Sequence, residues 1–165
     1  MVRPFQGRTM SATTSPAAAQ AERQRWLSIL AKAPEDRLEA LCRGIGETPD
    51  YTLLRRPEIG LVMVQGRISG SGAAFAAGEM TVTRAAVRLE GGQLGIGYVG
   101  GRRPRQAELV ALIDALGQLP HWRQPIEDRI VGPLAAEAEA RRRQRLATAA
   151  ATKVDFFTVA REAGS

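Results

Sequence analysis

A glycine-rich stretch that contains an arginine is the part of this sequence best suited to hold an anion. It runs from Gly66 to Gly78 and includes Arg67, Gly70 and Gly72. Glycines let backbone N–H groups approach a phosphate closely, and a guanidinium presents fork-shaped donors to its oxygens. The spacing matches neither a Walker loop nor a dinucleotide fingerprint, because no Lys-Ser/Thr pair follows and no helix opens there. Taken alone, the motif therefore favours a flexible connection between strands.

Three arginines further along the chain offer similar chemistry. Arg84 and Arg88 fall on one face of a predicted strand, because strand side chains alternate with a period of two, and Arg102 follows the next predicted strand. We expect Arg84 and Arg88 to meet either the carboxylates of a partner or substrate phosphates. The candidate phosphate- or partner-binding residues are Arg67, Gly70, Gly72, Arg84, Arg88 and Arg102.

The side chains that usually carry out catalysis are scarce. One cysteine, Cys42, and one histidine, His121, leave no means of building a disulfide, a zinc site or an iron–sulfur site from this chain alone. Cys42 is interpreted as a small core residue and His121 as a loop residue. The carboxylates of Glu79, Glu108 and Asp114 are interpreted as surface acids or as ion-pair partners of arginine. We predict no catalytic residue, no metal site and no cofactor bound by this chain.

Length, charge and hydropathy narrow the class of protein. A chain of 165 residues, 44% of them hydrophobic, suits one domain with its own core. The 23 Lys and Arg against 17 Asp and Glu give a net charge of +6, which favours anionic partners. No stretch approaches the roughly 20 apolar residues of a membrane span, and residues 1–15 lack the apolar centre of a signal peptide. We expect a soluble cytoplasmic protein that starts at Met1 or Met10.

The elements that position these residues are predicted from periodicity and from Gly and Pro punctuation. Helices are expected over 16–33, 35–43, 104–117 and 133–153, and strands over 51–55, 61–68, 80–89 and 93–99. Residues 119–124 are expected to form a loop. Glu90-Gly91-Gly92 predicts a hairpin between the last two strands. The fold class is α+β: an antiparallel sheet of about four strands with N-terminal and C-terminal helices packed on it.

The predicted domain organisation is a disordered extension over 1–14 followed by a single domain over 15–165. Within it, residues 133–165 form a long helix and a tail for subunit contacts. The apolar stripe of that helix is mostly alanine, so it gains little from packing on its own domain. Phe156 and Phe157 either fold back onto the core or anchor a partner. The candidate interface residues are Leu146, Val154, Asp155, Phe156 and Phe157.

Seven fragments, in order and at compatible spacing, make the chain resemble the PhnG family, which belongs to the bacterial carbon–phosphorus lyase system of phosphonate catabolism. They are Arg23-x-x-Trp26-x-x-x-Leu30-Ala31, Gly60-Leu61-Val62-x-x-Gln65-x-Arg67, Gly70-x-Gly72-x-x-Phe75-x-x-Gly78-Glu79, Thr83-Arg84-Ala85-Ala86-Val87-Arg88-Leu89, Tyr98-Val99-x-Gly101-Arg102, Ala107-Glu108-x-x-Ala111-Leu112-x-Asp114-Ala115-Leu116 and Val154-Asp155-Phe156-Phe157-Thr158. The sequence departs from the family pattern at Ser69 and Arg103. Ile96 and Gln106 stand where relatives often carry histidine, so no chemistry by those histidines applies here.

The resemblance implies a cytoplasmic hetero-oligomer with subunits H, I, J and L. With H, I and L, such proteins take part in making α-D-ribose 1-methylphosphonate 5-triphosphate from ATP and methylphosphonate, with loss of adenine. ATP is then a substrate of the assembly, and the iron–sulfur cluster and S-adenosylmethionine belong to the J subunit. We expect one component of a transferase, which is inactive alone and tends to self-associate.

A different class of function follows from the basic run Arg141-Arg142-Arg143-Gln144-Arg145. Such a run is typical of a module that binds RNA or another polyanion. Two observations weigh against it: Glu137 and Glu139 are spaced to pair with Arg141 and Arg143, and no aromatic residue is interleaved for base stacking. A small independent enzyme is disfavoured further, because no set of acid, base and nucleophile is visible.

Overall fold

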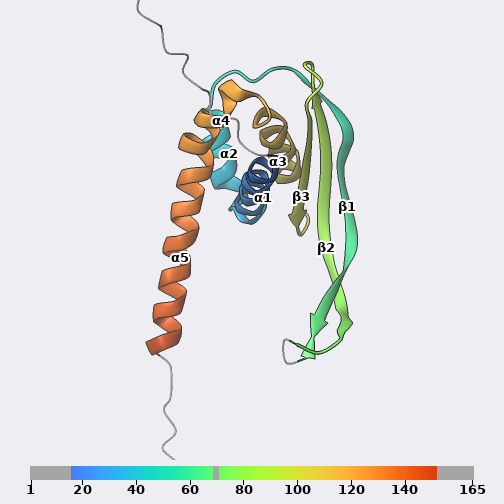
Figure 1. The fold of residues 1–165 in the computed structure, drawn as a ribbon, viewed down its shortest axis with the longest axis vertical. Coiled ribbons are helices and arrows are strands. Elements are labelled where there is room, and N and C mark those ends of the chain that lie inside the picture. The colour runs from blue at the N-terminus through green and yellow to red at the C-terminus, as the bar shows by residue number, and fades with distance from the viewer. Residues whose placement is uncertain (1–15, 69–70, 152–165) are drawn as a thin grey trace, which may run out of the picture.

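The structure, a computed structural model, describes residues 16–68 and 71–151. Two helices come first, three strands follow, and helices close the described part of the chain (Figure 1). The elements are α1 (Pro16–Lys32), α2 (Glu35–Arg43), β1 (Tyr51–Arg67), β2 (Ala74–Leu89), β3 (Leu94–Gly100), α3 (Pro104–Leu116), α4 (Pro120–Ile126), the π-helical segment η2 (Glu127–Val131) and α5 (Gly132–Ala151).

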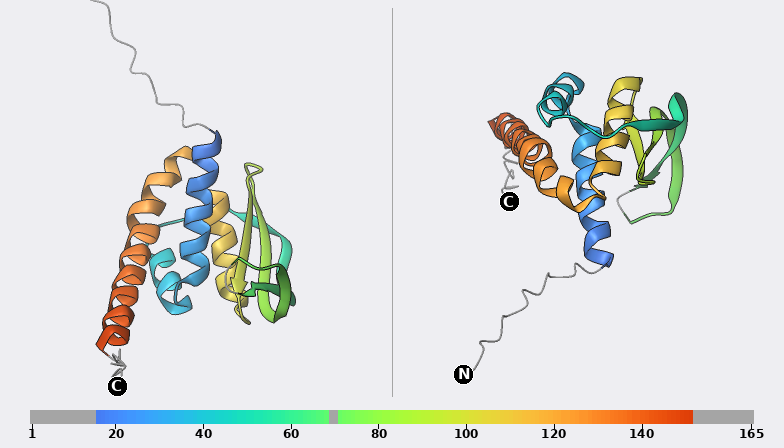
Figure 2. Two further views of the ribbon diagram at one scale, coloured as in Figure 1. Left: turned by 60° about the horizontal axis from the view of Figure 1, so that its bottom comes forward. Right: turned by 90° about the horizontal axis from the view of Figure 1, so that it is seen from above.

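The three strands form one antiparallel sheet in the order β1-β2-β3, with all the helices on one side of it (Figures 1 and 2). Helix α3 lies directly on β3 and β2, and α1, α2 and α5 lie beyond it. The predicted α+β class is thus confirmed. So is the hairpin between β2 and β3, where Gly92 takes the left-handed φ of +89° that a tight reversal requires.

The predicted count of four strands is wrong, because the first two predicted runs are a single strand. Pro57 and Gly60 separate these runs in the sequence, yet β1 passes through both residues and pairs with β2 along its length. Strand β1 is at the edge of the sheet, and Pro57 falls in the register shift between Arg55 and Glu58, so it has no register partner on β2. Edge strands and bulges are the places where a sheet tolerates proline. Strand β2 likewise begins at Ala74 instead of Met80.

The predicted loop over 119–124 is also wrong, since Pro120–Ile126 forms α4. Proline in the first helical turn needs no N–H partner, so Pro120 starts a helix where the sequence pattern predicts a break. His121 is therefore an exposed residue of a helix and not of a loop. The other predicted helices are confirmed within a residue or two, and the expected end of the last one at Lys153 lies outside the described residues.

The hydrophobic core lies between the inner face of the sheet and the helices. Nine of the thirteen residues of α3 are buried, which makes it the central helix. The largest buried apolar side chains come from every layer: Leu30, Leu38, Val87, Val99, Val110, Leu116, Ile126, Ile130, Val131 and Leu134. This core packs on one half of the sheet, while the far half of the β1–β2 hairpin extends beyond α1, α2 and α3 (Figure 1).

Candidate functional site

Arg84 and Arg88 lie exposed on the outer face of β2, as predicted. Their positions differ by four residues, which is about 13 Å along a strand. Arg84 Nη2 donates to Glu58 Oε1 at 3.2 Å, and Arg55 Nη1 donates to Glu58 Oε2 at 2.9 Å. Hydrogen bonding and charge attraction from Arg84, with Arg55 assisting, lower the pKa of Glu58. Arg84 thus already has a carboxylate partner within its own sheet.

Arg67 and Gly72 lie at the far end of the hairpin. Arg67 Nη1 donates to the backbone oxygen of Gly72 at 3.0 Å, and Arg67 pairs in register with Ala74. Ala74 and Arg84 are ten residues apart on β2, or about 33 Å. The structure therefore does not bring Arg67 together with Arg84 and Arg88 in one anion site. Arg102 is exposed in the turn between β3 and α3, and Gly70 lies outside the described residues.

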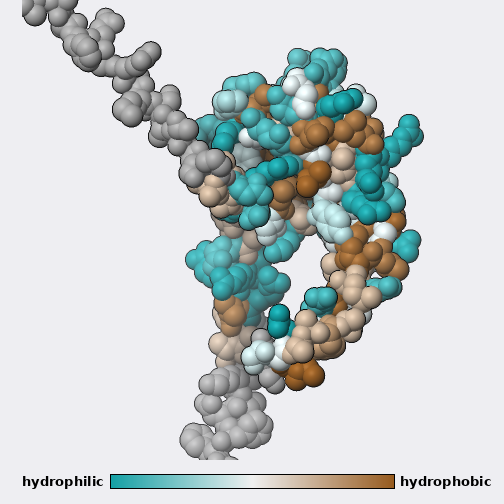
Figure 3. Space-filling view, turned by 45° about the vertical axis from the view of Figure 1, so that its right-hand side comes forward, coloured by the Kyte–Doolittle hydropathy of each residue, from teal (hydrophilic) through white to brown (hydrophobic). Residues whose placement is uncertain are grey.

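Apolar side chains cover the β3 part of the outer face of the sheet. Leu94, Ile96 and Tyr98 of β3 alternate towards this face, and each is about half exposed. Further apolar residues are exposed along the projecting part of the hairpin (Figure 3): Leu61, Met63, Val64, Ile68 and Phe75. Exposed apolar side chains gathered in this way are typical of protein–protein contact surfaces.

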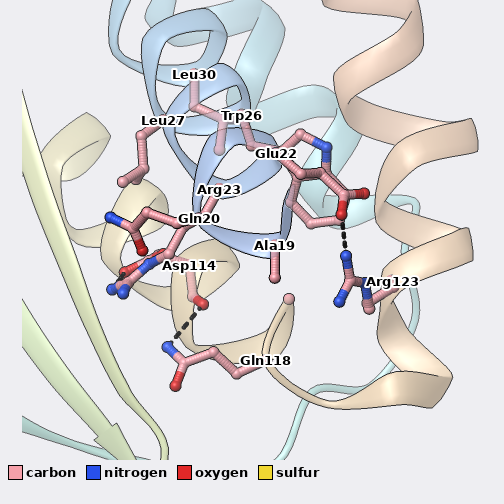
Figure 4. Close-up of a pocket in the computed structure, with 11 residues that line it drawn as sticks. Ala19, Gln20, Glu22, Arg23, Trp26, Leu27, Leu30, Asp114, Gln118 and Arg123 are labelled. Carbon is pink, nitrogen blue, oxygen red and sulfur yellow. Dashed lines mark hydrogen bonds and ion pairs between the residues drawn. The ribbon is translucent and has the colours of Figure 1, made fainter. Parts of the chain in front are cut away.

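A pocket between α1, α3 and α4 holds the most buried charge of the described chain. Arg23 Nε and Nη2 each donate at 2.7 Å to Asp114, whose side chain is 2% exposed, and Arg123 pairs with Glu22 at the other wall (Figure 4). The hydrogen bonds from Arg23 to the Asp114 carboxylate raise the pKa of Arg23. These charged side chains pair with one another, so the two ion pairs link α1 to α3 and α1 to α4.

The ion-pair interpretation of Asp114 is confirmed, but its burial escaped sequence reasoning. The sequence feature that could have indicated this burial is the position of Asp114 on the same helix face as Val110 and Ala107, four and seven residues before it.

Glu108 is half-buried and accepts a hydrogen bond from the Tyr51 hydroxyl at 2.6 Å. Burial, followed by this contact, raises the pKa of Tyr51.

Gln106 is a second buried polar residue whose structural role sequence reasoning missed. Its Nε2 donates to the backbone oxygens of Leu30 at 3.0 Å and Ala33 at 2.9 Å, at the carboxyl end of α1. Arg103 Nη1 donates to its Oε1 at 3.2 Å. Gln106 therefore satisfies helix-end carbonyls that would otherwise be buried without partners.

Cys42 has the character of a packed side chain and not of a nucleophile. It is half-buried against the core, and burial raises the pKa of its thiol to about 11. At neutral pH the reactive thiolate is then nearly absent.

Helix α5 packs on the rest of the protein only near its N-terminal end. Leu134 is fully buried, whereas residues 138–151 are all exposed, including the interface candidate Leu146. In the basic run, Arg141 pairs with Glu137, as predicted. Glu139 pairs with Arg142 and not with the predicted Arg143. Val154, Asp155, Phe156 and Phe157 lie outside the described residues.

Exposed apolar surfaces of this kind are typical of proteins that contact other chains, and the described residues bring no acid, base and nucleophile together in one site. Among the described helices, none is long and apolar enough to cross a bilayer.

Comparison with known proteins gives the family. The model of the family described as phosphonate metabolism protein PhnG matches residues 21–162. A protein of Rhizobium meliloti (strain 1021), named alpha-D-ribose 1-methylphosphonate 5-triphosphate synthase subunit PhnG, is 40% identical over 151 residues, which cover 92% of this chain and 96% of that protein. The chain belongs to the PhnG family, and the resemblance found in its sequence is confirmed.

Proposed function

We propose that this chain is a subunit of the assembly that makes α-D-ribose 1-methylphosphonate 5-triphosphate from ATP and methylphosphonate in phosphonate catabolism. The observation that carries the proposal is the 40% identity to a subunit of that synthase along nearly the whole of both chains. Subunits H, I, J and L are the proposed partners, and the cytoplasm the proposed location. The iron–sulfur cluster and S-adenosylmethionine are assigned to the J subunit.

The role proposed for the chain is to hold the assembly together, with phosphate contacts by its exposed arginines. Its exposed apolar residues on the sheet, the hairpin and α5 are the surface expected of a subunit outside its complex. Arg88 and Arg102 are the exposed candidates for a phosphate, since Arg84 and Arg67 already have partners within the chain. Phe156 and Phe157 are proposed to anchor a neighbouring subunit.

Reconstitution of the assembly with and without this chain tests the proposed function. Subunits H, I and L are combined with ATP and methylphosphonate, with and without this chain, and adenine release is measured. We expect turnover only when the chain is present, and no turnover by the chain alone.

Two results would contradict the proposal. One is full adenine release in the mixture that lacks the chain. The other is turnover by the purified chain without its partners, which would make it an independent enzyme. A variant with Arg88→Gln and Arg102→Gln separates the two roles: assembly that persists while adenine release falls assigns phosphate contact to these arginines.

A further inference from the structure

The two edge strands of the sheet, β1 and β3, differ in whether their outward backbone groups are covered, and the difference points to a binding surface. The order β1-β2-β3 leaves β1 and β3 each with one side that no strand of the described chain covers. Exposed strand edges carry unpaired N–H and C=O groups that invite pairing with another chain, so proteins usually cover or blunt them.

The β3 edge is covered by side chains of α3 and of the residues that follow it. Asp114 Oδ2 accepts a hydrogen bond from the N–H of Ile96 at 2.9 Å, and Gln118 Nε2, just beyond α3, donates to the backbone oxygen of Leu94 at 2.6 Å. Two of the outward groups of this edge are thus already bonded within the chain. A partner strand would have to break these bonds to pair there.

The hydrogen-bonding direction of β1 follows from the alternation of antiparallel ladders. Gly101 N–H donates to the backbone oxygen of Thr81 at 2.8 Å, so Thr81 faces β3, and its neighbours Met80 and Val82 face β1. Their register partners, Val62 and Gly60, therefore bond to β2. The residues between and beside them bond outwards, and these are Ile59, Leu61 and Met63.

Nothing in the described part of the chain covers this second edge. Ile59 is 44% exposed, Leu61 63% and Met63 59%. No side chain of the described residues donates to or accepts from their backbone groups. Helices α1, α2 and α3 end well before the tip of the hairpin, and α5 lies on the opposite side of the helical layer (Figure 1). A two-stranded ribbon is at best marginally stable in water by itself, so a third strand here would complete the sheet.

Charge identifies the kind of strand that fits. The hairpin from Tyr51 to Leu89 carries five arginines against two glutamates, which favours an acidic partner. A second copy fits poorly: pairing Ile59 with Met63 of the other copy, and Leu61 with Leu61, brings Arg55 and Arg67 of opposite copies to the same end of the pairing. Like charges directly opposite each other destabilise strand pairs.

We infer that the β1 edge at Ile59, Leu61 and Met63 binds an extended segment of another subunit of the assembly, with alternating apolar residues and flanking Asp or Glu, as an added fourth strand. Main-chain hydrogen bonds supply the affinity and the apolar side chains the specificity, as in other cases of strand addition. The inference rests on the proposed function, because it takes the partner from that assembly.

Hydrogen exchange resolved to single amides tests it in the chain alone and in the complex co-expressed with subunits H, I and J. Amides of Ile59, Leu61 and Met63 should exchange rapidly in the free chain and at least about tenfold more slowly in the complex. The amides of Gly60 and Val62 should exchange more slowly than these three in the free chain, since they already bond to β2, and should change less on assembly. This alternating pattern supports strand addition, whereas no change at the three outward amides overturns it.

A pair of substitutions at one position separates the backbone from the side chain. Leu61→Pro removes the outward N–H at an edge that already tolerates Pro57, and Leu61→Ala shortens the side chain but keeps the N–H. We expect the proline variant to bind the other subunits at least about tenfold more weakly than the alanine variant, with slow exchange at Gly60 and Val62 showing that the hairpin is intact. Equal binding by the two folded variants contradicts the inference.

The other possible outcomes of these experiments also test the inference or the proposed function. Protection of the three amides that grows with the concentration of the chain alone would assign the edge to a second copy and overturn the inference. Assembly of the wild-type complex without protection refutes the added strand but leaves the proposed function standing. Failure of the chain to co-elute with H, I and J overturns the proposed function, and the inference with it.

Discussion

At the scale of single residues, Asp114 joins three parts of the molecule. Its carboxylate accepts two hydrogen bonds from Arg23 of α1 and one from the backbone of Ile96 in β3, while the residue itself belongs to α3. A buried carboxylate is costly unless it is paired, and here its partners come from two different elements. The same side chain also covers the β3 edge, so one residue serves both packing and protection of the sheet.

Replacement of this carboxylate should therefore destabilise the fold. Asp114→Asn removes the charge that Arg23 faces, and we expect the free energy of unfolding to fall by about 2 kcal/mol. Urea unfolding at pH 7 measures the change. The matched control is Glu58→Gln, which breaks the exposed pairs with Arg55 and Arg84 and should leave stability unchanged. Equal losses in the two variants would show that burial of Asp114 adds nothing.

At the scale of elements, α3 and β3 approach each other unusually closely. A Cβ atom at Gly97 would lie 1.8 Å from the backbone oxygen of Ala107, and one at Gly95 would lie 1.9 Å from that of Ala111. Ala107, Ala111 and Ala115 are four residues apart and form one small-residue stripe on α3. Small residues on both elements let the backbones touch, and this contact brings Asp114 within reach of the strand.

A methyl group on this contact should force the helix away from the sheet. Gly97→Ala is expected to lower the free energy of unfolding by about 3 kcal/mol or more, because backbone atoms and not a flexible side chain must move. Gly100→Ala on the same strand is the control, since a Cβ there meets nothing within 4 Å. Thermal unfolding followed by circular dichroism compares the two. A tolerated Gly97→Ala would mean that α3 is not held at this distance.

At the scale of the whole molecule, two elements project from one compact body. The far half of the β1–β2 hairpin and the C-terminal half of α5 extend in the same direction from opposite sides of the helical layer (Figures 1 and 3). Both carry exposed apolar residues, among them Leu61 on the hairpin and Leu146 on the helix. Within the described residues the two projections are largely exposed, so each offers surface to a neighbouring subunit.

Two leucines on α5 distinguish the body from the projection. Leu134 is 1% exposed and Leu146 is 58% exposed. Leu134→Ala should lower the free energy of unfolding by about 3 kcal/mol through lost burial and a residual cavity, whereas Leu146→Ala should change it by less than about 0.5 kcal/mol. Chemical unfolding measures both, and co-elution with subunits H, I and J then shows whether Leu146→Ala weakens assembly. A large loss of stability in Leu146→Ala would place this half of α5 in the fold of the single chain.

The local signals in the sequence are sufficient for most elements. Periodicity locates the central helix within a residue, and the Glu90-Gly91-Gly92 reversal locates the second hairpin. The same signals fail at Pro57 and Pro120, where a proline predicts a break that the structure does not have. The meaning of a proline depends on whether its missing N–H was needed, and only the strand order and the helix start decide that.

The sequence by itself determined the family, the α+β class and the scarcity of reactive side chains, because these depend on residue types and their spacing. Only the tertiary structure decided that Arg67 and Arg84 are separated by about 33 Å along the strand, that Asp114 is buried against Arg23, and that the described residues cover one sheet edge and leave the other open. These properties arise between residues that are distant in sequence, where hydrogen-bond direction and packing are set by the neighbouring element and not by the local pattern.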